Sequence, residues 1–370
     1  MRLPEDELAA LKSASLLRHI PDANSSLKNF SSNDYLGLSQ HPEIKQVYQE
    51  AIEKYGAGST ASRLICGTME PHRNLEETIA TAKGTEAALT FSTGYATSVG
   101  VITSLLGKGD VVILDKLCHA SLIDGARMSE ATLRVFPHNH TEKLESLLQT
   151  ATTKADANSR ILVITESIFS MDGDAAPLKE ISRLSKQYGC LLLVDEAHAL
   201  GVIGPTGMGL AEELGIQDQI DFHMGTLGKA AGVAGGYLAT SRVWAELMIN
   251  RARSFIYSTA PPPAQAAAAA QALRIIQNEQ GQQLRTQLWN NIDTFRAASD
   301  MTSHCQSAIV PWMVGDSDEA LKLSSQLRDK GFLVPAIRYP TVPRQTARLR
   351  ITMSSCHDTE SIRALANCLR

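Results

Sequence analysis

The feature that most constrains the fold is an alternation that begins near residue 87, where short uninterrupted apolar runs are separated by segments of helix length. Uninterrupted apolar runs are typical of strands buried on both faces, and parallel strands require helix-length connections. The chain therefore predicts an α/β fold with a mostly parallel sheet covered by helices on both faces. Seven runs supply the expected strands: AALTFS, VVILDK, LRVFPH, ILVITES, CLLLVDE, DFHMGTL and GGYLATS.

The same pattern predicts three parts along the 370 residues, a length that is long for one domain. Residues 1–40 are expected to form an N-terminal helix and a connecting arm, and residues 41–280 a large domain built on the sheet. After about residue 280 three strand-like runs are interleaved with helices, which predicts a smaller C-terminal α+β domain over residues 281–370. These runs are SAIVPWMVG, FLVPAIRYPT and ARLRITMS.

Charge and composition exclude several classes of function. The formal net charge is −4, so the chain has no basic field to attract nucleic acid or an anionic membrane. No apolar run reaches the roughly 18 residues of a spanning helix. The first residues are acidic and amphipathic, unlike a targeting peptide. The six cysteines form no CxxC pair, which favours reduced thiols over a disulfide or metal framework and makes the cytoplasm the expected compartment.

Polar side chains gather where the expected strands end, which is the ligand-binding edge of an open α/β sheet. Gly94 and Tyr95 follow the first run at a strand-to-helix turn, where backbone amides suit a phosphate. His119 follows the second run and Ser170 follows the fourth. Taken alone, His119 could equally be a loop histidine with ordinary hydrogen bonds, and Ser170 carries almost no signal.

Asp195 ends a fully apolar run, and His198 follows three residues later. A carboxylate at the end of a buried strand is costly unless it meets a positive partner. Asp195 is therefore a candidate ligand-binding group, with a helix cap or a structural ion pair as the alternative.

Lys229 stands among small residues in the stretch GTLGKAAGVAGG, with Thr226 three positions before it. Small neighbours would give its side chain room to move beside a bulky partner. A phosphate-binding P-loop would need four residues between its glycines and Ser or Thr after the lysine, and the stretch has neither. A tight turn carrying a solvated lysine remains the alternative for this stretch alone.

Together these groups match what pyridoxal phosphate requires of a protein: an amine for the aldehyde, a carboxylate for the ring nitrogen, an imidazole for the ring face and amides for the phosphate. A nicotinamide cofactor would instead require GxGxxG after the first strand and an acidic residue about 20 positions later. STGYATSVG does not fit that pattern. The sequence therefore favours pyridoxal phosphate.

The motifs, in their order, resemble the α-oxoamine synthases of the fold-type I pyridoxal-phosphate enzymes. The resemblance covers most of the chain and includes these stretches: NFSSNDYLGLS, GAGSTASRLICGTMEPHRNLEE, HASLIDG, SIFSMDGDAAPL, VDEAHALGVIG, GTLGKAAGVAGG and TARLRITMSSCH. It implies a large domain with a seven-stranded sheet, a smaller C-terminal domain, and an acyl-transfer reaction. The segment before NFSSND is shorter than is usual in the family and lacks an extra strand.

The resemblance also implies a role for each cofactor residue. Lys229 would bind the cofactor covalently and later act as a base at the substrate Cα. Asp195 would pair with the pyridinium nitrogen, and His119 would stack on the ring. The other contacts are expected from Ser170 and His198 near the phenolic oxygen, and from Gly94, Tyr95 and Thr226 at the phosphate.

On the substrate side, the resemblance implies that Arg350 binds the amino-acid carboxylate, because a guanidinium offers paired donors. Asn33 and Thr341 would line the substrate site, Arg18 would contact the acyl group, and Arg348, on the opposite face of the strand, would be structural. Three stretches point to members that condense L-alanine with a pimeloyl thioester, carried on CoA or acyl carrier protein, in biotin biosynthesis: NFSSNDYLGLS, FIYSTAPPPAQA and AIRYPTVPRQTARLR.

Two alternatives stay open, and one assembly is expected. Sister enzymes that join glycine or serine to other acyl thioesters would share every cofactor residue. A regulatory paralogue without cofactor would have no reason to keep Lys229, Asp195 and His119 together. The resemblance implies a homodimer in which the segment GAGSTASRL lies at the subunit interface.

Overall fold

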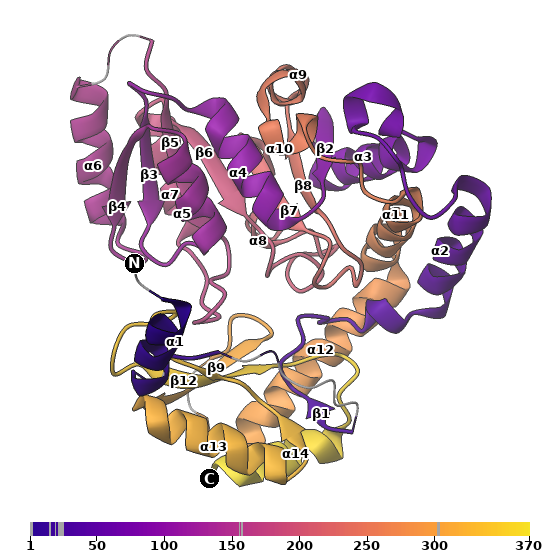
Figure 1. Ribbon diagram of the computed structural model, residues 1–370, viewed down its shortest axis with the longest axis vertical. Coiled ribbons are helices and arrows are strands. Elements are labelled where there is room, and N and C mark those ends of the chain that lie inside the picture. The colour runs from indigo at the N-terminus through magenta and orange to yellow at the C-terminus, as the bar shows by residue number, and fades with distance from the viewer. Residues whose placement is uncertain are drawn as a thin grey trace.

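The computed structural model describes residues 3–14, 16–18, 20, 26–154, 156, 158–301 and 304–370. Figure 1 shows a broad α/β body above a smaller α+β part, with the long helix α12 (Glu279–Ala298) running from one to the other.

A seven-stranded sheet forms the centre of the body, in the order β2-β8-β7-β6-β5-β3-β4. All pairings from β7 to β4 are parallel, and only β8 runs antiparallel to both of its neighbours. The prediction of a mostly parallel sheet with seven strands is therefore confirmed. The strands are β2 (Ala87–Phe91), β3 (Val111–Asp115), β4 (Thr132–Phe136), β5 (Ile161–Glu166), β6 (Leu191–Asp195), β7 (Phe222–Thr226) and β8 (Gly236–Thr240).

Both faces of the sheet are covered because successive strand residues point to opposite sides. Leu162 and Ile164 of β5 pack in one apolar cluster, whereas Val163 between them packs in another. The first cluster includes α4 (Gly94–Leu105), α5 (Ala120–Met128), α9 (Arg242–Arg251) and α10 (Arg253–Ile256). The second includes α6 (Thr141–Lys154), α7 (Leu178–Gln187) and α8 (Leu210–Leu214).

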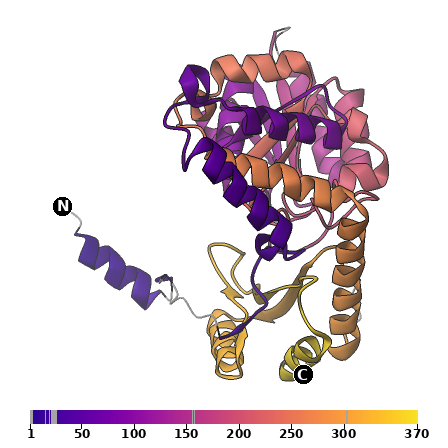
Figure 2. The same ribbon diagram turned by 90° about the vertical axis from the view of Figure 1, so that its right-hand side faces the viewer.

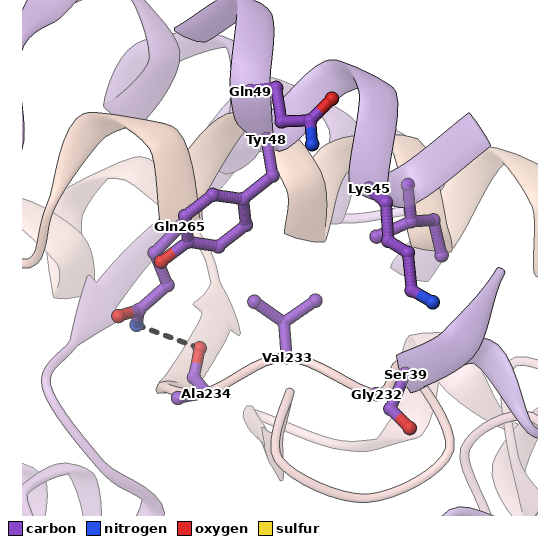
Figure 3. A pocket seen from close by; sticks show the side chains of 9 residues that line it. Ser39, Lys45, Tyr48, Gln49, Gly232, Val233, Ala234 and Gln265 are labelled. Carbon is purple, nitrogen blue, oxygen red and sulfur yellow. Dashed lines mark hydrogen bonds between the residues drawn. The ribbon is translucent and has the colours of Figure 1, made fainter. Parts of the chain in front are cut away.

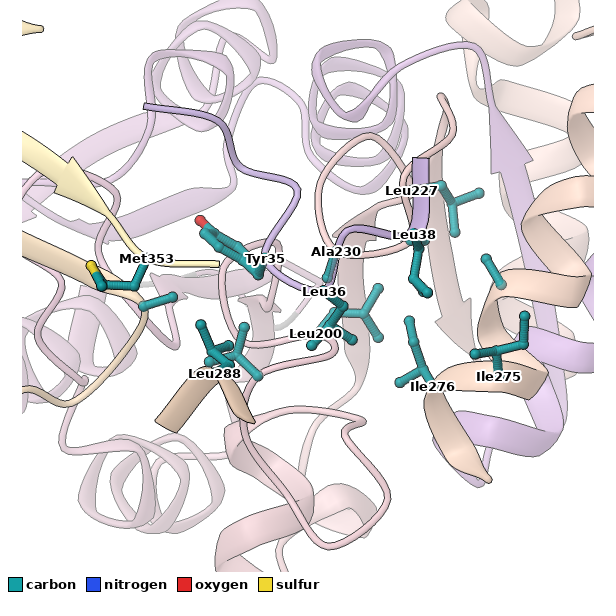
Figure 4. Close-up of a cluster of buried hydrophobic side chains, with 14 of the residues drawn as sticks. Tyr35, Leu36, Leu38, Leu200, Leu227, Ala230, Ile275, Ile276, Leu288 and Met353 are labelled. Carbon is teal, nitrogen blue, oxygen red and sulfur yellow. The ribbon is translucent and has the colours of Figure 1, made fainter. Parts of the chain in front are cut away.

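At the β2–β8 end, the sheet is covered by a third apolar cluster that also extends into the smaller part. Three helices pack together there: α2 (Pro42–Tyr55), α3 (Glu70–Lys83) and α11 (Pro263–Gln277). Figure 4 shows where this cluster meets the Lys229 loop, with Leu36, Leu38 and Ala230 packed against the junction of α11 and α12.

The smaller part contains a three-stranded sheet in the order β11-β12-β9, flanked by α13 (Ser317–Asp329) and α14 (Thr359–Leu369). Its strands are β9 (Ile309–Gly315), β11 (Ala336–Ile337) and β12 (Ala347–Thr352). The run FLVPAIRYPT, expected as one strand, is divided into β10 (Phe332–Leu333) and β11. Pro335 between them has no N–H to continue a ladder. β10 pairs instead with β1 (Lys28–Asn29), a short strand that was not expected.

The expected N-terminal helix is present as α1 (Pro4–Ser13), and Figure 2 shows it standing away from the rest of the chain. None of its residues is buried. Much of the connecting arm, including residues 21–25, lies outside the described residues. Within the described ranges, no helix is both long and apolar enough to cross a membrane.

A buried ion pair ties α3 to the end of β6. The Lys83 amine donates to Glu196 Oε2 over 2.7 Å, and both side chains are almost fully buried. Glu196 Oε1 accepts from the Ala211 amide of α8, so three elements meet at one carboxylate. Attraction to Lys83 overcomes the effect of burial and lowers the pKa of Glu196 to about 2.

Replacing Lys83 by Ala should lower the free energy of unfolding by about 3–5 kcal/mol, because Glu196 would remain buried without its cation. Urea unfolding of the cofactor-free protein, followed by fluorescence, measures this change. Lys54→Ala, which removes an exposed partner of Glu70, is the matched control and should keep the wild-type midpoint. A wild-type midpoint for Lys83→Ala would contradict the account.

Candidate active site

Lys229 lies in the loop between β7 and β8, and its small neighbours have a packing reason. Gly232 has φ +67°, and a Cβ there would collide with the backbone of Leu38 and Ser39. Ala230 is buried so closely that a Cβ at Gly201 would come within 2.6 Å of its own. The small residues therefore let the loop pack beneath the segment 36–39, whereas the sequence suggested room for Lys229 to move.

Two carboxyl groups lie near the Lys229 amine at the carboxyl ends of adjacent strands. Glu166 of β5 and Asp195 of β6 are paired in register, and both are buried. The cavity they share with Lys229 has a volume of about 190 Å³. It is lined by Gly94, Tyr95, His119, Ser121, Glu166, Asp195, Ala197, His198, Met224, Gly225, Thr226 and Lys229.

The charged groups in this cavity act on one another. Burial lowers the pKa of the Lys229 amine to about 8, against the opposing attraction of Asp195 and Glu166. Burial likewise raises the pKa of Asp195, which accepts the Ala197 amide over 2.9 Å. Burial and repulsion from Asp195 raise the pKa of Glu166 to about 8. Because the two carboxyl groups are buried and close together, they do not both ionise readily, and the pair retains a proton more easily than isolated carboxyl groups would.

The sequence interpretation missed Glu166, although the signal was the one that identified Asp195. Glu166 also ends a fully buried strand, ILVITE, and only the strand order shows that the two carboxyl groups are neighbours. Its Oε1 accepts the backbone N–H of His119 over 2.5 Å. Glu166 therefore holds the start of the loop that carries the imidazole.

His119 is the N-cap of α5, with Nδ1 2.9 Å from the Ser121 hydroxyl. Burial lowers its pKa, which favours the neutral imidazole. His119 lines both the Lys229 cavity and a larger neighbouring cavity of about 660 Å³, so it stands where the two meet.

A row of polar contacts leads from Lys229 to the smaller part of the protein. The Lys229 amine lies 2.6 Å from His198 Nε2, and the Tyr35 hydroxyl lies 2.5 Å from His198 Nδ1. Tyr35 also donates to Asn33 Oδ1, which accepts from Arg350 over 3.1 Å. Tyr35 was missed because its motif gives no spacing that assigns it a partner. This row of contacts joins three predicted residues, His198, Asn33 and Arg350, to Lys229.

Burial keeps two groups in this row of contacts uncharged, the His198 imidazole and the Tyr35 phenol. Burial lowers the pKa of His198 well below its ordinary value, with Lys229 and Arg350 acting in the same direction. Burial also raises the pKa of Tyr35 to about 12, despite the nearby Arg350 cation. A neutral imidazole and a neutral phenol therefore lie between the basic side chains of Lys229 and Arg350.

At another part of the cavity wall, α4 begins with Gly94 and Tyr95. Thr93 caps this helix by accepting the Ala96 amide over 3.0 Å, and the first amides of a helix have no partners within it. Thr226 lies beside them, because a Cβ at Gly94 would be 3.5 Å from the Thr226 side chain. The three residues predicted for a phosphate therefore lie together.

The other predicted residues line the larger cavity. Arg18 donates to the Thr341 hydroxyl over 3.3 Å, and both line this cavity together with Ser170. Ser170 does not line the Lys229 cavity; its carbonyl accepts from Arg350 Nε over 2.7 Å. Arg348, expected to be structural, donates to Asp172 over 2.5 Å and borders the same cavity.

A third cavity, of about 470 Å³, lies on the other side of the Lys229 loop, between α2 and residues 232–234 (Figure 3). Val233 and Tyr48 border it, and Gln265 donates to the Ala234 carbonyl over 2.9 Å. None of the predicted site residues lines this cavity. The candidate site consists of the first two cavities.

Glu166→Gln should flatten the pH dependence of stability of the cofactor-free protein. The pKa of Glu166 rises from its ordinary 4.5 to about 8 in the folded chain, so folding binds a proton. The free energy of unfolding therefore falls as pH rises through that window, and Gln, which does not titrate, removes the fall. Thermal unfolding midpoints between about pH 5 and 8 test this.

Glu53→Gln, which changes an exposed carboxyl on α2, is the control and should keep the wild-type dependence. An unchanged slope in Glu166→Gln would show that Glu166 ionises in the folded protein as it does in the unfolded chain.

Comparisons with known proteins agree with this geometry. Residues 26–369 match the family described as aminotransferase class I and II. The 8-amino-7-oxononanoate synthase of Geobacter sulfurreducens is 47% identical, over 92% of this chain and 87% of that protein. The protein of the same name from Citrifermentans bemidjiense is 45% identical, over 91% and 87%.

Solved structures give the same fold. A serine palmitoyltransferase from S. paucimobilis with bound PLP has a TM-score of 0.90 and 31% identity, and the match covers 98% of this chain and 94% of that one. The 8-amino-7-oxononanoate synthase of Francisella tularensis has a TM-score of 0.79 and 28% identity, over 94% and 97%. The fold-type I architecture is therefore confirmed, and the chain belongs to the class I and II aminotransferase family, within its α-oxoamine synthases, which are pyridoxal-phosphate-dependent acyltransferases.

Proposed function

We propose that the protein catalyses the decarboxylative condensation of L-alanine with a pimeloyl thioester, which yields 8-amino-7-oxononanoate, carbon dioxide and the free thiol in biotin biosynthesis. The observation that carries the proposal is the buried line of contacts from the Lys229 amine to Arg350, with His119 at the opening to the larger cavity. Sequence relatives with 43–47% identity carry the name of this synthase.

When bound, pyridoxal phosphate supplies an aldehyde for an amine and a protonated ring that stabilises negative charge on the adjacent carbon. The residues present fit this group. The Lys229 amine has a pKa near 8, so a reactive neutral fraction exists at neutral pH, and the Asp195 carboxylate lines the same cavity. The first turn of α4 and Thr226 offer donors for a phosphate.

We assign the cofactor contacts accordingly. Lys229 binds the aldehyde, Asp195 holds the ring nitrogen in its protonated form, and His119 lies on the ring face. The remaining contacts are assigned to His198 at the phenolic oxygen, and to Gly94, Tyr95 and Thr226 at the phosphate. Ser170, expected beside the phenolic oxygen, lines the larger cavity instead and is not assigned to the cofactor.

Toward the amino acid, Arg350 binds the carboxylate and Lys229 takes the proton from Cα. Arg350 suits this role because it is buried and oriented by Ser170, Thr352 and Asn33, and a held guanidinium loses little freedom on binding a carboxylate. His119 then lies toward the acyl carbonyl and donates to the oxygen that gains charge.

Toward the acyl donor, we assign the larger cavity. Its lining combines apolar side chains, such as Phe169 and Val342, with Arg18 and Thr341. Apolar walls suit a methylene chain, and the exposed Arg18 suits the anionic end of the donor or its carrier.

The alternative is a sister activity that uses serine or glycine with another acyl thioester. The high TM-score with serine palmitoyltransferase supports it, whereas the identity of 31% against 47% for the synthases favours the alanine reaction. One methyl group of substrate is worth only about 1–3 kcal/mol of discrimination, so the amino acid must be identified by assay.

Incubation of the purified holoenzyme with pimeloyl-CoA and each of alanine, glycine and serine tests the proposal. We expect 8-amino-7-oxononanoate, identified by mass, to form from alanine about tenfold or more faster than the corresponding ketones from glycine or serine. Acyl carrier protein as the pimeloyl carrier forms a second arm. Preferred condensation of serine or glycine would move the protein to the sister activity.

We also propose a homodimer. The side chains of Leu64, Ile65 and Tyr257 are exposed, and the bridge between Ser62 and Thr259 brings their segments together. Exposed apolar side chains that gather on adjoining segments support an interaction surface. α10 lies against the start of α4, since Ser254 donates to the Ala96 carbonyl, so the surface is close to the proposed phosphate site. The cytoplasm is the proposed compartment, consistent with six free cysteines.

Light scattering of the wild-type holoenzyme should give twice the mass of one chain. Ile65→Glu should shift the protein toward monomers and weaken cofactor binding, because a charge would be buried at the interface. Val243→Glu, at an exposed position on α9, is the control and should remain dimeric. An active wild-type monomer would contradict the proposal.

A further inference from the structure

His138 lies between two carboxylates outside the cavities described above. It follows β4 by two residues, and its Nδ1 lies 3.1 Å from Asp115 Oδ1, at the end of β3. Its Nε2 lies 2.8 Å from Asp174 Oδ2. The imidazole also meets Phe169 edge-on, with ring centroids 4.4 Å apart. The ring is therefore held from three directions.

The contacts of His138 with Asp115 and Asp174 are ionic. Although partial burial acts in the opposite direction, hydrogen bonds to Asp115 and Asp174 raise the pKa of His138 to about 10. Hydrogen bonds between charged groups are roughly twice as strong as neutral ones. Asn139 adds two more contacts: its amide N–H donates to Asp115, and its side chain donates to Asp174.

Asp174 belongs to a tight loop, residues 168–175, that the smaller part of the protein holds from its other side. Ser307 donates to the Gly173 carbonyl over 2.9 Å, and Gln306 accepts the Ala175 amide over 2.7 Å. Arg348 donates to Asp172. The loop therefore lies between the large sheet and the smaller part of the protein. His138 and Asn139 hold it on the side of the sheet.

The same loop carries the groups that orient the proposed carboxylate site. The Ser170 carbonyl accepts from Arg350 Nε over 2.7 Å, which sets the direction of the guanidinium. Phe169 and Ser170 line the larger cavity, and the Phe169 ring also makes the edge-on contact with His138. A shift of the loop would therefore move the Arg350 donors relative to Lys229.

We propose that His138 is a positioning residue for amino-acid recognition: by joining Asp115 to Asp174 it holds the loop 168–175 so that the Ser170 carbonyl aims Arg350 at the substrate carboxylate. The inference rests on the proposed function only in taking Arg350 as the carboxylate-binding group. His138 itself lines neither cavity of the candidate site and acts through the loop.

Two variants test the inference in the holoenzyme. Asp174→Asn is close in shape, concerns a partly exposed side chain, and removes the charge from the link between His138 and the loop. His138→Gln removes the cation and its link to both carboxylates. The control is His140→Gln, at an exposed histidine paired with Glu142 two residues along the chain. The dissociation constant for L-alanine is measured from the visible absorption change without any acyl donor, and kcat and KM are measured with pimeloyl-CoA.

Both test variants should weaken L-alanine binding about tenfold, because His138→Gln removes and Asp174→Asn weakens a hydrogen bond between charged groups. KM for alanine should rise by the same factor, while kcat at saturating alanine falls less. A general loss of structure would not give that split. The control should stay within about twofold of wild type. If His138→Gln does not fold, Asp174→Asn decides.

Wild-type alanine affinity in a folded Asp174→Asn or His138→Gln protein would overturn the inference. Failure of the proposed function has a different signature, since wild-type holoenzyme would then prefer another amino acid in the binding titration. The variants are in that case compared with that amino acid, whose carboxylate Arg350 would still bind.

Discussion

The structure depends on one arrangement of charge: a buried amine beside two carboxyl groups at the ends of adjacent parallel strands. Strand order and register bring Glu166 and Asp195 together, and the loop after β7 brings Lys229 to them. Two buried carboxylates cannot both ionise at little cost, so one keeps a proton and the other balances the amine. A lysine with a lowered pKa and a carboxyl group in the same cavity are what a covalently attached, ring-protonated cofactor requires.

The sheet alone does not complete the site. Arg350 comes from β12 in the smaller part, and its guanidinium is oriented by the Ser170 carbonyl and by Asn33. The segment 33–39 packs over the Lys229 loop, and its Tyr35 hydroxyl contacts His198 Nδ1. Amine and guanidinium are thus set relative to each other by two segments distant in sequence. Under the proposed function, the position of the smaller part decides where the substrate carboxylate binds.

Much of this could be predicted from the sequence. Short apolar runs identified the seven strands of the large sheet, because strands buried on both faces admit few polar residues. The exception is the edge strand β4, which is mostly exposed although its run was recognised. Asp195 stood out as a charge at the end of such a run. Glu166 gave the same signal, yet its meaning depends on strand order. β10 and β11 were expected as one strand, since the run does not reveal that its halves pair with different partners on either side of Pro335. Tyr35, Lys83 and His138 act through contacts between distant segments, which no local pattern encodes.

Reduction of the holoenzyme with borohydride, followed by peptide mapping, tests the central claim most directly. Lys83 is more deeply buried than Lys229, but Glu196 holds it as a charged ion pair, and its pKa is raised above the ordinary value. Among the lysines that the structure describes, Lys229 alone has a lowered pKa, and it lines the same cavity as Asp195. The account predicts that the reduced pyridoxyl group is recovered on the peptide containing Lys229. Recovery on Lys83 or any other lysine, or no covalent adduct, would contradict it.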